Sequence, residues 1–137
     1  MMVFADAFAL IAWLNPRDRA HADVVSYLER YRGRLVTTEW VLMEVADALS
    51  SPEARGPVAA FLRAVRADAQ FEIVGYLPSP YDAGLKLFAA RADKAWSLTD
   101  CISFGVMSER KLVDALTADH HFEQAGLKAI FRDATQP

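Results

Sequence analysis

Four acidic side chains of this sequence could do chemistry together: Asp6, Glu44, Asp100 and Asp119. Asp6 and Asp119 each follow a short apolar run of the kind that forms a buried strand. Glu44 interrupts the apolar side of a predicted helix, on the side that we expect to face the core, where a charged group needs a partner. Asp100 lies in the first turn of another predicted helix, where it could cap backbone N–H groups or point toward the other carboxylates.

A cluster of carboxylates needs a compensating charge. Carboxylates brought together in a partly desolvated cleft repel one another, unless one is protonated or a cation lies between them. Mg²⁺ and Mn²⁺ prefer carboxylate and water oxygens, and such an ion can generate a hydroxide nucleophile and orient phosphate oxygens. Each Asp also has an ordinary interpretation, because Asp at the start of a helix is a common N-cap. The coincidence of four acids favours the metal interpretation.

Strand and helix signals alternate along the chain. Short apolar runs predict strands at residues 2–5, 34–37, 71–74, 112–118 and 128–131. Helical spacing of apolar residues predicts helices at about 7–14, 18–32, 39–49, 57–68, 80–92, 98–110 and 121–125. This alternation predicts an α/β fold, a three-layer α/β/α domain with a mostly parallel central sheet. Functional groups gather outside the carboxyl ends of such strands, so Asp6 and Asp119 should face one crevice.

Length and composition limit the remaining possibilities. The chain has 137 residues, which predicts one domain over residues 1–137. Its single cysteine, Cys101, cannot form an internal disulfide and favours a reducing, cytoplasmic location. We expect no membrane segment, because no apolar run approaches the length that spans a bilayer. The net charge of −3 argues against binding nucleic acid through overall charge, although a local basic rim, with Arg17, Arg91 and Lys94 as candidates, stays possible.

The residues around the four acids resemble the PIN-domain ribonucleases, and most closely the VapC-like toxins of type II toxin–antitoxin pairs. The matching segments are residues 3–6, 37–45, 93–104 and 115–122. The most specific part is the run Trp-Ser-Leu-Thr-Asp-Cys at 96–101, with an acid at a strand end nineteen residues after Asp100. The resemblance covers nearly the whole chain.

This resemblance implies a specific activity and set of partners. It places Asp6, Glu44, Asp100 and Asp119 on the family's acidic quartet, which holds Mg²⁺ or Mn²⁺, and Thr99 on a hydroxyl position beside it. It implies hydrolysis of RNA phosphodiester bonds, a small antitoxin protein as partner, and a homodimer. The family usually has a Ser or Thr shortly after the first Asp. Ala7 and Phe8 stand there in this chain, so we expect weaker metal binding or lower activity.

The predicted helices at 40–49 and 57–68 carry more apolar residues than one core-facing stripe needs. These residues are Val41, Leu42, Val45, Val58, Phe61, Leu62 and Val65. A groove between the two helices would suit an amphipathic helix of an antitoxin. The alternative is that these residues complete the core of a monomer.

Two other functions compete with the nuclease. A binding or decoy module would keep the fold without turnover, and the residues after Asp6 favour it. A phosphorylated receiver domain would need an acidic pair after the first strand and a late Lys, and the sequence has neither. We expect His120 and His121 to be solvent-exposed at a helix start, Trp40 and Trp96 to serve packing, and Cys101 to be buried and inert.

Overall fold

Five strands of the computed structural model form one sheet, in which every neighbouring pair is parallel. The structure describes residues 1–135. The order across the sheet is β3-β2-β1-β4-β5, with strands β1 (Met2–Ala5), β2 (Arg34–Thr38), β3 (Phe71–Val74), β4 (Asp114–Leu116) and β5 (Lys128–Ala129). The predicted α/β fold with a parallel central sheet is therefore confirmed.

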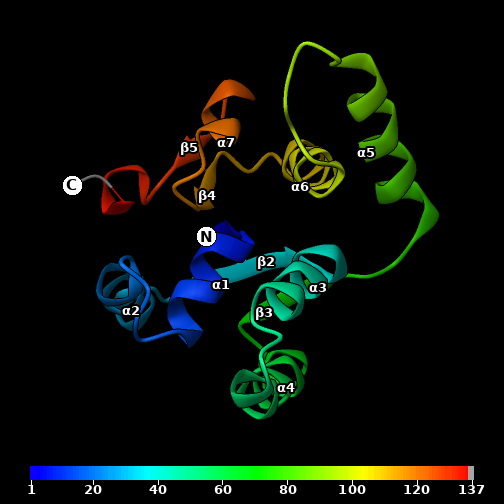
Figure 1. The fold of residues 1–137 in the computed structure, drawn as a ribbon. Coiled ribbons are helices and arrows are strands. Elements are labelled where there is room, and N and C mark those ends of the chain that lie inside the picture. Colours follow the sequence, from blue (N-terminus) through cyan, green and yellow to red (C-terminus); the bar gives the residue numbers. More distant parts are fainter. Residues whose placement is uncertain (136–137) are drawn as a thin grey trace.

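Helices connect the strands throughout. They are α1 (Ala7–Leu14), α2 (His21–Arg30), α3 (Glu39–Ala48), α4 (Pro52–Ala67), α5 (Pro78–Ala90), α6 (Leu98–Glu109) and α7 (His120–Gln124), and a 3-10 turn, Arg132–Thr135, follows β5. Figure 1 shows α1 to α4 in the lower half of the molecule with β2 and β3, and α5 to α7 in the upper half with β4 and β5. None of these helices is long and apolar enough to span a membrane.

Side-chain caps fix the starts of the helices that carry the acids. The Thr38 hydroxyl accepts a 3.1 Å hydrogen bond from the Val41 N–H, as expected of an N-cap. Ser97 caps α6 by accepting from the Asp100 N–H at 3.0 Å, while the Asp100 carboxylate accepts from the Ser97 N–H, which makes a capping box. These bonds set where each helix begins and therefore where its acid points.

Several element boundaries differ from the sequence prediction. Helix α4 begins at Pro52 rather than 57, because Pro fits the first helical position, and Pro57 lies inside the helix. The predicted strand 112–118 is reduced to Asp114–Leu116, since Lys111 adopts a positive φ before it and the chain leaves the ladder after it. The predicted strand 128–131 pairs only at Lys128–Ala129.

The core surrounds β1, which lies in the middle of the sheet between β2 and β4. Val3, Phe4 and Ala5 are all buried, as expected of a parallel strand covered on both faces. Helix α5 packs against α6 at Gly84, where an added Cβ would lie 2.9 Å from backbone atoms of Ile102. The rest of α5 is largely exposed.

Candidate functional site: a cluster of carboxylates

The carboxyl ends of β1 and β4 bring two of the predicted acids together. The strands are neighbours in the sheet, with Ala5 opposite Leu116. Asp6 follows β1 directly and is the N-cap residue of α1, and Asp119 follows β4 by a short segment and is the N-cap residue of α7. Both acids therefore lie at the same end of the sheet, and the shared crevice stays a prediction.

Asp6 is the most buried of the four acids, with 6% of its surface exposed. The Thr117 hydroxyl donates a 2.8 Å hydrogen bond to its Oδ2 atom. Burial, followed by repulsion from Glu44 and Asp100, raises the pKa of Asp6 to about 7, although the Thr117 bond partly offsets the rise. These interactions show that Asp6, Glu44 and Asp100 lie near enough to affect one another's charge.

Asp100 both caps its helix and points toward the other acids, the two roles that the sequence allowed for it. Its Oδ2 atom accepts from the Ser97 N–H at 3.2 Å and also lies 3.2 Å from Nδ1 of His121, at the start of α7. The carboxylate therefore caps its own helix and points toward the end of β4. Both contacts hold the side chain in one orientation.

Glu44 is exposed, and the prediction that it would face the core is wrong. Val41 and Val45 take the core-facing side of α3 and are fully buried, which turns Glu44 toward the other acids. Its pKa is raised, first by partial desolvation and then by repulsion from Asp100 and Asp119. Glu44 therefore belongs electrostatically to the same cluster.

Thr99 is half-buried and lies beside Glu44. The two residues line a hollow of about 230 Å³ together with Trp40, Met43, Asp47 and Tyr76. The Trp40 ring packs edge-on against Tyr76 at 5.2 Å between centroids. Trp40 therefore has the packing role that was predicted, and together with Tyr76 it also forms an aromatic wall of the hollow beside Glu44.

Two further residues, His121 and Thr117, contact the acids and were not predicted as site residues from the sequence. His121 is not exposed as expected: 21% of its side chain is accessible, and its Nδ1 atom lies near Asp100 and 3.5 Å from Asp119 Oδ1. Thr117 was assigned only to a strand. A Thr two residues before an acid at a strand end was the available signal, because its hydroxyl could reach the neighbouring strand.

Two of the three candidate basic residues, Arg91 and Arg17, do not contact the acids. The Arg91 guanidinium bonds to Asp93 at 2.9 and 3.0 Å and lies over the Trp96 ring. Arg17 follows the C-terminal end of α1, whereas Asp6 precedes its N-terminal end. Trp96 and Cys101 are buried, which agrees with their predicted packing roles.

The donor set fits a hard divalent cation. Four carboxylates approach one another, and within residues 1–133 no Lys or Arg forms an ion pair with any of them. A buried carboxyl whose pKa is raised to about 7 by burial and by neighbouring acids is a group that a bound cation would relieve. The geometry supplies oxygen ligands without a built-in counter-charge.

The family model of the PIN domain matches residues 3–128 of this sequence. The chain belongs to the PIN-domain family. The match includes all four acids, from Asp6 to Asp119. No curated protein sequence matches this PIN domain significantly.

Among solved structures, this PIN domain is similar to VapC20 of Mycobacterium tuberculosis, described as a Sarcin-Ricin loop cleaving toxin. The TM-score is 0.85 at 19% sequence identity, covering 93% of this chain and 98% of that chain. At this identity, the likeness shows that the two proteins share a fold. The predicted resemblance to VapC-like PIN domains is confirmed at that level.

Proposed function

We propose that this PIN domain, taken as one domain over residues 1–137, is a metal-dependent endoribonuclease. It hydrolyses phosphodiester bonds of RNA and acts in the cytoplasm as the toxin of a toxin–antitoxin pair. The observation that carries the proposal is the buried Asp6 carboxyl, surrounded by further acids without a Lys or Arg partner. Membership of the PIN family and the fold shared with a toxin that cleaves the Sarcin-Ricin loop support it.

Asp6, Glu44, Asp100 and Asp119 would hold one or two Mg²⁺ or Mn²⁺ ions, with the Thr99 hydroxyl beside them. When bound, such an ion polarises water for attack on phosphorus and offsets charge on the leaving oxygen. The protein orients the donors in advance. Thr117 fixes Asp6, and Ser97 fixes Asp100, so little reorganisation is needed at the moment of reaction.

The direct test is cleavage of RNA by purified protein in Mn²⁺ and in EDTA. We expect cleavage in Mn²⁺ and none in EDTA. RNA that binds but is never cut, at any Mn²⁺ or Mg²⁺ concentration, would instead identify a binding module. Cleavage that persists in EDTA would contradict the metal-dependent proposal.

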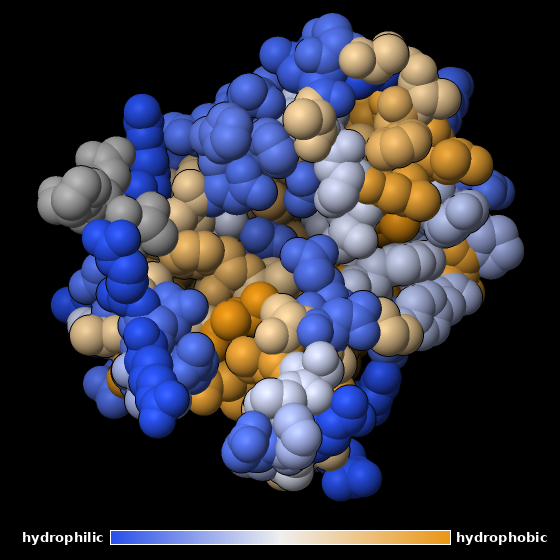
Figure 2. All heavy atoms as spheres, viewed as in Figure 1, coloured by the Kyte–Doolittle hydropathy of each residue, from blue (hydrophilic) through white to orange (hydrophobic). Residues whose placement is uncertain are grey.

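The outer face of α5 is a candidate surface for the homodimer. Tyr81, Leu85 and Phe88 follow helical spacing along one stripe, and they are 39%, 42% and 46% exposed. Figure 2 shows hydrophobic residues gathered at the upper right, where α5 lies in Figure 1. A contiguous apolar stripe of this kind is typical of an interaction surface. A second copy of the chain, packing α5 on α5, would bury it.

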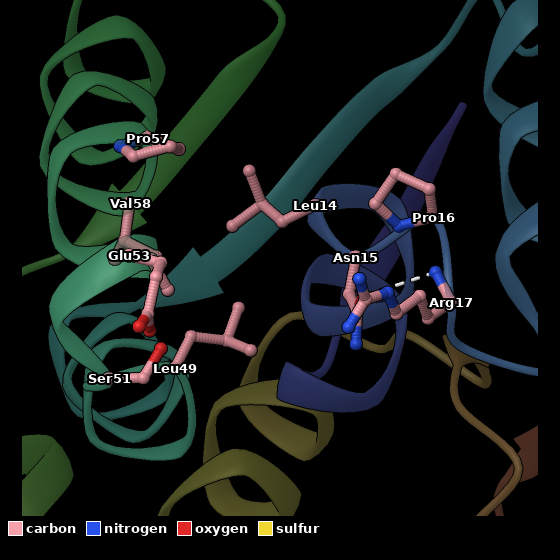
Figure 3. A pocket seen from close by; sticks show the side chains of 10 residues that line it. Leu14, Asn15, Pro16, Arg17, Leu49, Ser51, Glu53, Pro57 and Val58 are labelled. Atoms are coloured by element: carbon pink, nitrogen blue, oxygen red, sulfur yellow. Dashed lines mark hydrogen bonds between the residues drawn. The ribbon is translucent and has the colours of Figure 1, made fainter.

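Most of the apolar residues that were predicted to line an antitoxin groove do not line one. Val41, Leu42, Val45 and Val65 are buried in the chain's own core, so they do not form a free surface. Val58 and Leu62 do line a hollow of about 280 Å³ between α3 and α4. A larger groove of about 520 Å³ lies between the end of α1 and the start of α4. Figure 3 shows Leu14, Leu49 and Val58 on its walls, with Arg17 and Glu53 at its sides.

An amphipathic antitoxin helix fits this groove, because apolar walls would take its apolar face and Arg17 and Glu53 its charged edges. A54W would fill the groove, and A64W, on an exposed part of the same helix, is the control. We expect A54W to lose co-purification with the small protein encoded beside the toxin, and A64W to keep it. Retention by A54W would place the antitoxin elsewhere.

A further inference from the structure

Two imidazoles lie next to the acidic cluster at the start of α7. Nδ1 of His120 and Nδ1 of His121 lie 3.6 and 3.5 Å from Oδ1 of Asp119. Nδ1 of His121 also lies 3.2 Å from Oδ2 of Asp100, on α6. Asp119, His120 and His121 thus present three potential ligand atoms in one place, and Asp100 contacts this group through His121.

These separations suit the coordination shell of one ion. Ligand atoms about 2.0–2.1 Å from a tetrahedral Zn²⁺ ion are roughly 3.3–3.4 Å from one another. Three of the six ligand pairs are separated by 3.2 to 3.6 Å, around that value, and the ligand atoms of Asp119, His120 and His121 all lie within 4.8 Å of one another. In the ion-free chain Nδ1 of His121 is hydrogen-bonded to Asp100, and an ion that binds at this nitrogen takes the place of the proton in that contact.

The ligand types distinguish this site from the all-carboxylate one. Imidazole nitrogens suit Zn²⁺ and its neighbours in the transition series, whereas Mg²⁺ and Mn²⁺ prefer oxygen. We propose that Asp100, Asp119, His120 and His121 form a second binding site, which takes a borderline transition-metal ion such as Zn²⁺. Because Asp100 and Asp119 belong to both sets, an ion at this site excludes the hard ion. That Zn²⁺ excludes the hard ion rests on the proposed function, whereas Zn²⁺ binding itself does not.

The two sites differ in the residues that they do not share. Asp6 and Glu44 serve the hard ion alone, and the two histidines serve Zn²⁺ alone. The chain has three histidines, and the third, His21, lies apart with Nδ1 2.7 Å from the Ala12 carbonyl oxygen. H21Q is therefore a matched control for the loss of a histidine.

Calorimetric titration of untagged protein with Zn²⁺ tests the proposal, and Co²⁺ as a probe reports tetrahedral nitrogen and oxygen ligands by its visible absorption. We expect one Zn²⁺ per chain, binding at least about tenfold weaker in H120Q/H121Q, and unchanged in H21Q. D6N and E44Q should keep Zn²⁺ binding while they lose Mn²⁺ binding. Circular dichroism establishes that each variant is folded.

The outcomes separate the two proposals. Equal Zn²⁺ affinity in wild type and H120Q/H121Q, or an equal loss in H21Q, would overturn the second site. If Mn²⁺ binds through Asp6 and Glu44 but Zn²⁺ does not bind, the proposed function stands and the second site falls. If Zn²⁺ binds through the histidines but Mn²⁺ never binds, the second site stands and the metal-dependent nuclease falls.

Discussion

The Thr117 hydroxyl donates a 2.8 Å hydrogen bond to Asp6 across 111 residues of sequence. The same hydroxyl oxygen accepts the Asp119 N–H at 3.1 Å. One side chain therefore joins the first and last acids of the cluster. Ala7 and Phe8 leave no hydroxyl directly after Asp6, and Thr117 supplies one to that carboxyl from the neighbouring β4 end of the sheet.

T117V is expected to weaken both the fold and the metal site. Valine has nearly the same shape but leaves the buried Asp6 Oδ2 and the Asp119 N–H without this partner, at a cost of about 1–3 kcal/mol in the free energy of unfolding. Mn²⁺ affinity should also fall, because Asp6 is no longer held. Denaturant unfolding and calorimetric titration measure the two effects. S103A is the control, since the buried Ser103 hydroxyl has no hydrogen-bond partner among the described residues; an equal effect of both variants would contradict the assigned role.

The stability of the metal-free protein should fall as pH rises from about 4 to 7. The folded chain raises the pKa of Asp6 to about 7 by burial, whereas the unfolded chain has the ordinary value near 3.9. The folded state thus binds an extra proton between these values, and deprotonation costs a few kcal/mol. D6N stays neutral, so in EDTA it should match wild type at pH 4 and be more stable at pH 8. Parallel stability–pH curves for the two proteins would show that Asp6 does not have a raised pKa.

Mn²⁺ should stabilise the folded protein because it offsets the repulsion among the acids. Ligand linkage gives about 2.7 kcal/mol when free Mn²⁺ is a hundredfold above its Kd. This corresponds to an increase of roughly 5–10 °C in Tm for a chain of this size. Thermal unfolding with and without millimolar Mn²⁺ measures the shift. No shift in wild type, or the same shift in D6N, would argue against a metal site at these carboxylates.

D100N should abolish RNA cleavage and leave the fold intact. The amide keeps an oxygen that can accept from Ser97, but it removes one negative ligand from the proposed metal shell. Cleavage of a labelled RNA, together with circular dichroism, separates the two effects. D82N is the matched control, since Asp82 is exposed on α5. Full activity in D100N would remove Asp100 from the catalytic residues.

The homodimer should depend on the outer stripe of α5. L85E/F88E introduces two charges there without touching the core, so we expect a dimer in wild type and a monomer in the variant by light scattering. V113E is the control, because Val113 is 58% exposed but lies outside α5. A dimer that survives L85E/F88E would place the interface on another face.

The sequence predicts the architecture of this protein better than it predicts the contacts inside the site. Alternating strand and helix signals locate the sheet, and Asp6 and Asp119 lie at adjacent strand ends as expected. The orientation of Glu44 is not predicted correctly, because helical periodicity alone does not show which residues of α3 pack against the core. The contacts of Thr117 and His121 are missed as well, since they join residues far apart in the chain and depend on the exact ends of β4 and α6.

The central position of β1 has a consequence for synthesis of the protein. The strand is made first, but its partner β4 emerges from the ribosome more than a hundred residues later. Until then one edge of β1 lacks its hydrogen-bonding partner, and Asp119 is missing from the cluster. Such a long-range pairing forms late in folding. A nascent or truncated chain would therefore lack the complete acidic centre, so translation itself would delay the appearance of activity.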